Sequence, residues 1–125
     1  MSTLNVSNIT DGTTTVGTSY VVNGSAKAWV NFNGTGTIAA RDSLNLSSLT
    51  DNGTGVYAIS YTSNMVSDNY FVSGQSAGGG SVWHFWNGSD YGYPTASGVG
   101  FSSGYSSVTS ADAPFVFVGI IGDLA

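Results

Sequence analysis

The chain has 125 residues, of which only 7% are charged, and two cations, Lys27 and Arg41, stand against seven aspartates. Two basic side chains in a chain of net charge −5 cannot neutralise a row of phosphates, so we expect neither nucleic acid nor an anionic membrane surface as a partner. No apolar run approaches the ~20 residues that span a bilayer, so membrane insertion is not expected either. The chain lacks cysteine but is 41% hydrophobic and 13% aromatic, which is enough apolar surface for one folded domain without disulfides.

The first 25 residues carry isolated apolar side chains among Ser, Thr, Asn and Gly. Such a segment cannot bury a face on its own. We therefore predict that residues 1–25 form an extended segment, shaft-like or interface-forming, which winds against copies of itself; a poorly ordered terminus is the alternative. Residues 1–5 have neither the basic region nor the apolar stretch of a secretory signal peptide, so we expect no such signal; release by lysis, as part of a particle, is one other way for the chain to leave its cell.

From residue 26 the side chains for the two faces of a strand begin to alternate along the chain. Ala28, Val30 and Phe32 fall on one face of a predicted strand. Asn33-Gly34 predicts a tight hairpin turn, followed by a second strand at residues 37–42. Asp51-Asn52-Gly53 predicts another turn by the same mechanism.

Further strands are predicted at residues 56–62, 69–74 and 82–86, and Tyr57, Ile59 and Tyr61 share one face of the first. A glycine- and serine-rich stretch over residues 88–110 separates them from a last strand at residues 114–121. That strand is apolar on both faces, so we expect both faces to be covered. Helix is expected to be scarce, because Glu, Lys, Arg and Gln are nearly missing. The pattern predicts an all-β fold, an antiparallel β-sandwich over residues 26–125.

Three stretches of the chain resemble sequence motifs of a known family. KAWVNFNGTG at residues 27–36, Arg41-Asp42-Ser43 and LTDNGTGVY at residues 49–57 resemble the C-terminal domains of bacteriophage tail fibres, of the marine and cyanobacterial phage type. The closing FVFVGII at residues 115–121 resembles the apolar final strand of that family. The resemblance implies a virion tail-fibre tip domain, an intertwined homotrimer that meets other tail or fibre proteins and contributes to host-cell attachment.

Two other functions fit the same residues. The chain could be a stand-alone carbohydrate-binding or adhesin domain, monomeric and with its aromatic side chains on an open face. It could also be a purely architectural fibre cap or trimerisation domain that has no ligand.

Catalytic and metal chemistry find little support in the sequence. There is no cysteine nucleophile, no G-x-S-x-G turn, and a single histidine, His84. Asp68, Asp90 and Asp112 lie in turn-like settings, where a solvated side chain is expected rather than a pair of catalytic carboxyl groups. We therefore expect no enzyme, no cofactor and no metal. Copies of His84 could meet on a three-fold axis, but a histidine bonded to backbone or water on a half-buried strand is the simpler interpretation.

The best predicted ligand site is the aromatic segment at residues 83–94. If Trp83 and Phe85 point inward, an outward face combines aromatic rings with Asn and Asp side chains, which could bind a host-surface glycan; core or subunit-interface packing is the alternative. Trp29 and Tyr57 are interpreted as packing residues, and Lys27, Arg41 and Asp42 as a possible intersubunit ion pair. The predicted carbohydrate-binding residues are Trp86, Asn87, Asp90, Tyr91 and Tyr93.

Overall fold

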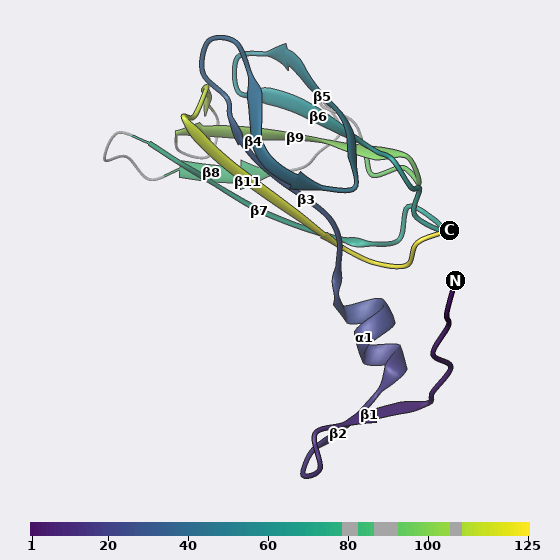
Figure 1. Ribbon diagram of the computed structural model, residues 1–125. Coiled ribbons are helices and arrows are strands. Elements are labelled where there is room, and N and C mark those ends of the chain that lie inside the picture. Colours follow the sequence, from purple (N-terminus) through teal and green to yellow (C-terminus); the bar gives the residue numbers. More distant parts are fainter. Residues whose placement is uncertain (79–82, 87–92, 106–108) are drawn as a thin grey trace.

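The computed structural model describes residues 1–78, 83–86, 93–105 and 109–125, with the backbone alone for residues 83–86 and 105. This part of the chain is mostly β-strand with one short helix, which confirms the predicted all-β class (Figure 1). The elements in chain order are β1 (Asn8–Thr10), β2 (Thr15–Gly17), α1 (Thr18–Gly24), β3 (Ala26–Asn33), β4 (Ala39–Leu44), β5 (Leu46–Gly53), β6 (Val56–Tyr61), β7 (Phe71–Ala77), β8 (Trp83–Trp86), β9 (Gly98–Tyr105), β10 (Thr109–Ser110) and β11 (Phe115–Ile121).

The strands that follow α1 form two antiparallel sheets. One has four strands in the order β4-β3-β11-β7, and the other has the order β10-β9-β6-β5 with β8 paired to β9. The chain crosses between them at Asn45, whose φ of 57° is unusual for a residue other than glycine. The Asn45 side chain holds this corner, because its amide donates to the Ser63 carbonyl at 2.9 Å and accepts from the Ser63 backbone N–H at 2.7 Å.

Side chains from both sheets meet in one hydrophobic core. On β3 the predicted inward residues Ala28, Val30 and Phe32 are at most 2% exposed, as the alternation requires. Tyr57 of β6 is fully buried and meets the Phe32 ring edge-on, with 5.0 Å between the ring centroids. The predicted inner faces of residues 26–32 and 56–62 are therefore confirmed.

Strand β9 lies in the glycine- and serine-rich stretch, for which the sequence analysis predicted no strand. Val99 and Phe101 of β9 are 3% and 0% exposed and belong to the core. Their neighbours in β9 are Gly and Ser, which carry too little apolar surface to mark a strand in the sequence. They suit this position because β9 packs closely on β6: a Cβ atom at Gly98 would collide with the Ile59 carbonyl oxygen.

Both predicted hairpin turns occur a few residues later in the chain. The connection between β3 and β4 spans residues 34–38, and the residue with positive φ is Gly36 rather than Gly34. Gly34 is required for space, because a Cβ atom there would lie 2.5 Å from the Tyr57 hydroxyl. The second hairpin turns at Thr54-Gly55, since Gly53 still pairs with Val56.

The N-terminal segment is not simply extended. It contains the β1–β2 hairpin and the helix α1, which the scarcity of helix-forming residues did not predict. None of the residues of α1 is buried, and Figure 1 shows helix and hairpin projecting away from the two sheets. We refer to residues 1–25 as the arm and to residues 26–125 as the β domain.

Candidate functional site

The outer face of the four-stranded sheet carries the best candidate for a binding site. The register places Gly119 of β11 opposite Trp29 on one side and Ser73 on the other. Two residues earlier, Phe117 lies opposite Asn31 and Gln75. Directly opposed residues of antiparallel strands point to the same face, so these six side-chain positions share the outer face.

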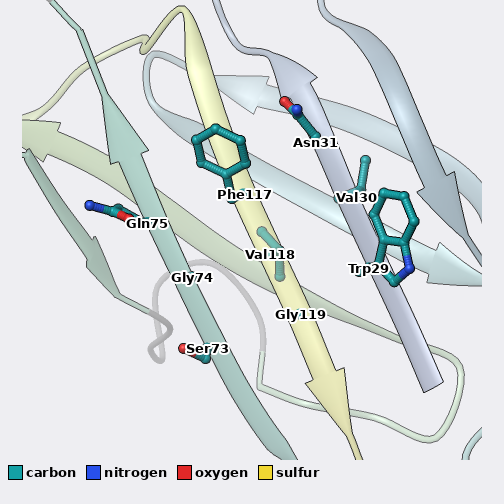
Figure 2. Close-up of a pocket in the computed structure, with 9 residues that line it drawn as sticks. All are labelled: Trp29, Val30, Asn31, Ser73, Gly74, Gln75, Phe117, Val118 and Gly119. Carbon is teal, nitrogen blue, oxygen red and sulfur yellow. The ribbon is translucent and has the colours of Figure 1, made fainter. Parts of the chain in front are cut away.

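Between these residues the sheet surface is hollowed. The hollow has a volume of about 630 Å³, with Val30, Gly74 and Val118 also among its lining residues. Gly119 creates the space at its centre, because a Cβ atom built there would meet nothing within 4 Å. Figure 2 shows the lining residues coming from the three neighbouring strands β3, β11 and β7. We call this hollow the groove.

Two aromatic rings flank the groove. Trp29 is half-buried and Phe117 is 40% exposed, so both present ring surface to solvent. They are diagonal neighbours across β3 and β11, a position in which side chains roughly 7–8 Å apart still reach one another. None of the residues that line the groove is charged.

The polar groups of the groove are amides and a hydroxyl. Gln75 and Ser73 are exposed, and Asn31 is half-buried. The side-chain oxygen of Asn31 accepts a hydrogen bond from the Arg41 guanidinium at 3.4 Å. This contact orients the amide and leaves the Asn31 NH₂ group as the donor available to a ligand.

Arg41 reaches the outer face because of a β-bulge. Asn31 pairs with Asp42 but Phe32 pairs with Ala40, so Arg41 is the extra residue. Its guanidinium lies 4.4 Å from the Phe115 ring centroid and donates to the Pro114 carbonyl at 2.6 Å. The Phe115 ring in turn stacks on the Phe117 ring, with 6.5 Å between the ring centroids and an angle of 6° between the ring planes. These contacts hold Phe117 beside the groove, and they give Arg41 a role that needs no intersubunit ion pair.

The expectation that both faces of the last strand are covered is wrong for the single chain. Val116, Val118 and Ile120 are buried, but Phe115 and Phe117 are 45% and 40% exposed. The inner face meets the core, whereas the outer face lies open because no element of the described chain covers it.

The arrangement suits a neutral sugar better than other small ligands. A pyranose ring has an apolar C–H face that packs on an aromatic ring, and an edge of hydroxyl groups that pair with amides. An open groove with aromatic walls and a few convergent polar groups offers both. A row of phosphates would find no cation in it.

Of the predicted carbohydrate-binding residues, only Tyr93 has a described side chain. Asn87, Asp90 and Tyr91 fall outside the described residues, as does the side chain of Trp86, whose backbone belongs to β8. Tyr93 is described and is 67% exposed, but it does not line the groove. The sequence analysis treated Trp29 as a packing residue. The signal that it missed is the alternation that puts Trp29 and Asn31 on the face opposite the core.

A polar cluster around the Tyr57 hydroxyl has a structural role in the β domain. The Tyr57 hydroxyl donates to the Gly34 carbonyl at 2.8 Å and to the Asp112 carboxylate at 3.2 Å, and that carboxylate also accepts from the Gly55 N–H at 2.6 Å. Burial, and then the charge of Asp112, raises the pKa of Tyr57 well above its ordinary value. Tyr57 therefore stays a neutral donor, and the cluster joins both hairpin connections to residues 111–113.

Within the described ranges no three His, Asp or Glu residues lie close enough together to hold a metal ion. The side chain of His84 falls outside those ranges, so both interpretations of this histidine stay predictions. No described helix has the length and apolar character that a membrane crossing requires.

Comparisons with protein-family models, with curated proteins and with solved structures found no match to this chain. The assignment of a function therefore depends on the residues and geometry described above.

Proposed function

We propose that this chain is a non-enzymatic tail-fibre domain of a virion, which contributes to host-cell attachment by binding a surface polysaccharide in the groove. In this proposal the two sheets form a β-sandwich, three copies assemble into a homotrimer, and other tail or fibre proteins hold the trimer on the particle. Neither nucleic acid nor a membrane interior is a partner.

The observation that carries the proposal is the open, uncharged groove with two aromatic rings in its lining, Trp29 on β3 and Phe117 on the central strand β11. Trp29 and Phe117 offer two stacking surfaces, while Asn31, Ser73 and Gln75 offer hydrogen bonds between and beside them. The groove lies across the surface of a sheet rather than in a deep pocket, so it can receive an internal stretch of a chain. A polysaccharide has that form.

The sequence motifs that resemble those of tail-fibre domains support the same proposal in a different way. The stretches at residues 33–36 and 54–57 lie far apart in the sequence, but the Tyr57 hydrogen bond to Gly34 joins them. The shared residues therefore specify how two hairpin connections of this β domain are joined to each other. They concern the fold, which leaves the outer face free to differ between proteins that bind different glycans.

Glycan binding by groove variants tests the proposal. Purified protein is applied to an array of neutral and acidic microbial polysaccharides, and the affinity for the best binder is measured by titration calorimetry. Phe117→Ala and Trp29→Ala should each weaken binding at least about ten-fold, as expected for an aromatic anchor worth more than ~1.4 kcal/mol. Tyr93→Ala is the matched control, an exposed aromatic outside the groove, and it should bind like the wild type.

The outcomes separate the candidate sites. Loss of binding in Tyr93→Ala with full binding in Phe117→Ala would move the site to the segment predicted from the sequence. Equal binding by wild type and all three variants would refute the groove as the glycan site.

A second candidate function is architectural, and the exposed aromatic pair favours it. Phe115 and Phe117 form an apolar patch of the kind that subunit interfaces cover. In a fibre cap without a ligand, another copy would cover this face. Absence of binding to every polysaccharide, together with dissociation of the assembly by Phe117→Asp, would favour this function over attachment.

A further inference from the structure

The arm is left largely uncovered by its own chain. Its apolar side chains are all exposed, from Leu4 at 82% and Tyr20 at 76% to Val16 at 37%. The helix α1 has seven residues, no buried side chain and no side-chain hydrogen bond at its N-cap, Gly17. Nothing that normally stabilises so short a helix is present.

Such elements are not stable in water by themselves. Isolated helices shorter than about 12–15 residues are marginal, and so is a single two-stranded hairpin. The arm consists of one such helix and one such hairpin. A surface from another molecule must therefore cover them if they are to persist.

The directions in which the apolar side chains of α1 point show how many neighbouring surfaces would be needed to cover the helix. Tyr20, Val21 and Val22 are consecutive, and successive residues of a helix point about 100° apart. They therefore occupy three sides of the helix rather than one stripe. A helix that is apolar around most of its circumference needs neighbours on several sides.

One side is already occupied by the helix's own β domain. Val21 and Val22 line a notch of about 560 Å³ together with Val66 and Leu124 of the β domain. The base of this notch is firm, because the Val66 N–H donates to the Asp123 carbonyl at 2.8 Å. Lys27 fixes the joint between helix and strand by donating to the carbonyl and the hydroxyl of Ser25, at 2.9 and 2.7 Å. The notch is still open to solvent, since all four apolar side chains are at least 43% exposed.

We infer that α1 is an assembly helix, whose remaining sides are covered by the α1 helices of two further copies of this chain in a closed three-fold ring. The inference rests on the homotrimer of the proposed function, and it names the segment that holds the trimer together. Each helix then lies between its own notch and two neighbouring helices, which covers all three apolar sides. A closed ring of identical contacts leaves no helix at an open end.

The charge distribution permits copies of the same chain to meet at α1. Each chain carries a net charge of −5, so two copies repel one another overall. Residues 12–26 contain no charged side chain, so α1 and its neighbours can approach without that repulsion. The helix also projects away from the two sheets, where other copies can reach it (Figure 1).

Light scattering on a sizing column tests the inference with the full chain. The wild type should have three times the chain mass of 12.8 kDa, and Val21→Asp/Val22→Asp should have one chain mass. Ser47→Asp/Ser48→Asp is the matched control, because it adds the same two charges at exposed positions of β5, and it should stay trimeric. Tyr20→Ser is a milder second variant, for which the trimer should dissociate at higher protein concentration than in the wild type.

A monomeric wild type would overturn the inference, and so would a trimer that survives Val21→Asp/Val22→Asp. Near-ultraviolet circular dichroism should show that this variant keeps the folded β domain, because both valines lie outside the core. Glycan titration separates this test from that of the proposed function, because the monomeric variant should keep the affinity of each groove. A monomer that binds glycan supports both proposals, whereas a trimer without glycan binding refutes only the groove.

Discussion

The β domain and the arm contain similar apolar residues but use them in opposite ways. In the β domain, Val30, Phe32 and Ile59 are at most 2% exposed, whereas in the arm Ile9, Val21 and Val22 are at least 43% exposed. The difference lies in the arrangement along the chain. Alternating residues give β3 and β6 one continuous apolar face, and strand pairing brings these faces together. In the arm the apolar residues are isolated or consecutive, so no single face collects them.

The comparison teaches that burial within a chain follows from periodicity and partners, and not from apolar content alone. The β domain completes its core with its own strands. The arm has apolar side chains on several sides and is too short to cover them itself, and we propose that other copies of the chain cover them. Substitutions in the two regions should therefore affect different measurements.

The largest effect is expected in the core. Phe32→Ala should lower the free energy of unfolding by about 3–5 kcal/mol, because Phe32 is fully buried between Tyr57 and Phe101 and its removal leaves a cavity. Denaturant unfolding measures the change. Ile9→Ala, in the exposed β1–β2 hairpin, is the counterpart in the arm and should change the stability of the β domain by less than about 0.5 kcal/mol. A comparable loss in both variants would show that arm and domain unfold as one unit.

Two glycines of one hairpin provide a smaller and sharper test. Gly53 and Gly55 have φ values of 129° and 67°, so alanine strains the backbone at both. Around Gly53 there is open space, whereas a Cβ atom at Gly55 would collide with the backbone of Ser103 and Ala111. Gly53→Ala should cost about 1 kcal/mol from the backbone alone, and Gly55→Ala about 2–3 kcal/mol from strain and overpacking together. Equal costs for the two variants in thermal melting would contradict the close packing of Ser103 and Ala111 on Gly55.

Much of the β domain could be predicted from the sequence, and the failures have physical reasons. Alternation in residues 26–32 and 56–62 correctly assigned the inner faces. It failed for β9, since Gly and Ser there are selected by close packing against β6, which no local pattern reveals. It also misplaced both turns by a few residues. Asn33 and Asp51 fix loop backbone through their side chains. Positive φ occurs at Gly36 rather than Gly34 in the first connection, and at Gly55 as well as the predicted Gly53 in the second.

The candidate site was less predictable than the fold. Alternation in the sequence predicts that Trp29 and Phe117 point away from the core. It does not predict that β3 and β11 are neighbouring strands. Their pairing joins residues about 90 positions apart, and only that pairing brings Trp29, Asn31 and Phe117 around Gly119. The aromatic segment at residues 83–94 attracted attention because its aromatic residues are consecutive in the sequence. Proximity in space, rather than in sequence, forms the groove.

The smallest effect concerns the hydroxyl groups of buried tyrosines. Burial first, and then the hydrogen bond with Tyr70, raises the pKa of Tyr61 well above its ordinary value. In the unfolded chain Tyr61 ionises near pH 10, so above that pH the unfolded state releases a proton that the folded state retains. The stability contributed by the neutral hydroxyl is present below pH 10 and is lost as the pH rises further. At pH 10.5 this linkage amounts to less than about 1 kcal/mol for one tyrosine. Tyr61→Phe has no proton to release at this position, so its melting temperature should fall less than that of the wild type between pH 9 and pH 10.5. Identical falls would show that Tyr61 ionises as readily in the folded β domain as in the unfolded chain, and that water reaches this part of the core.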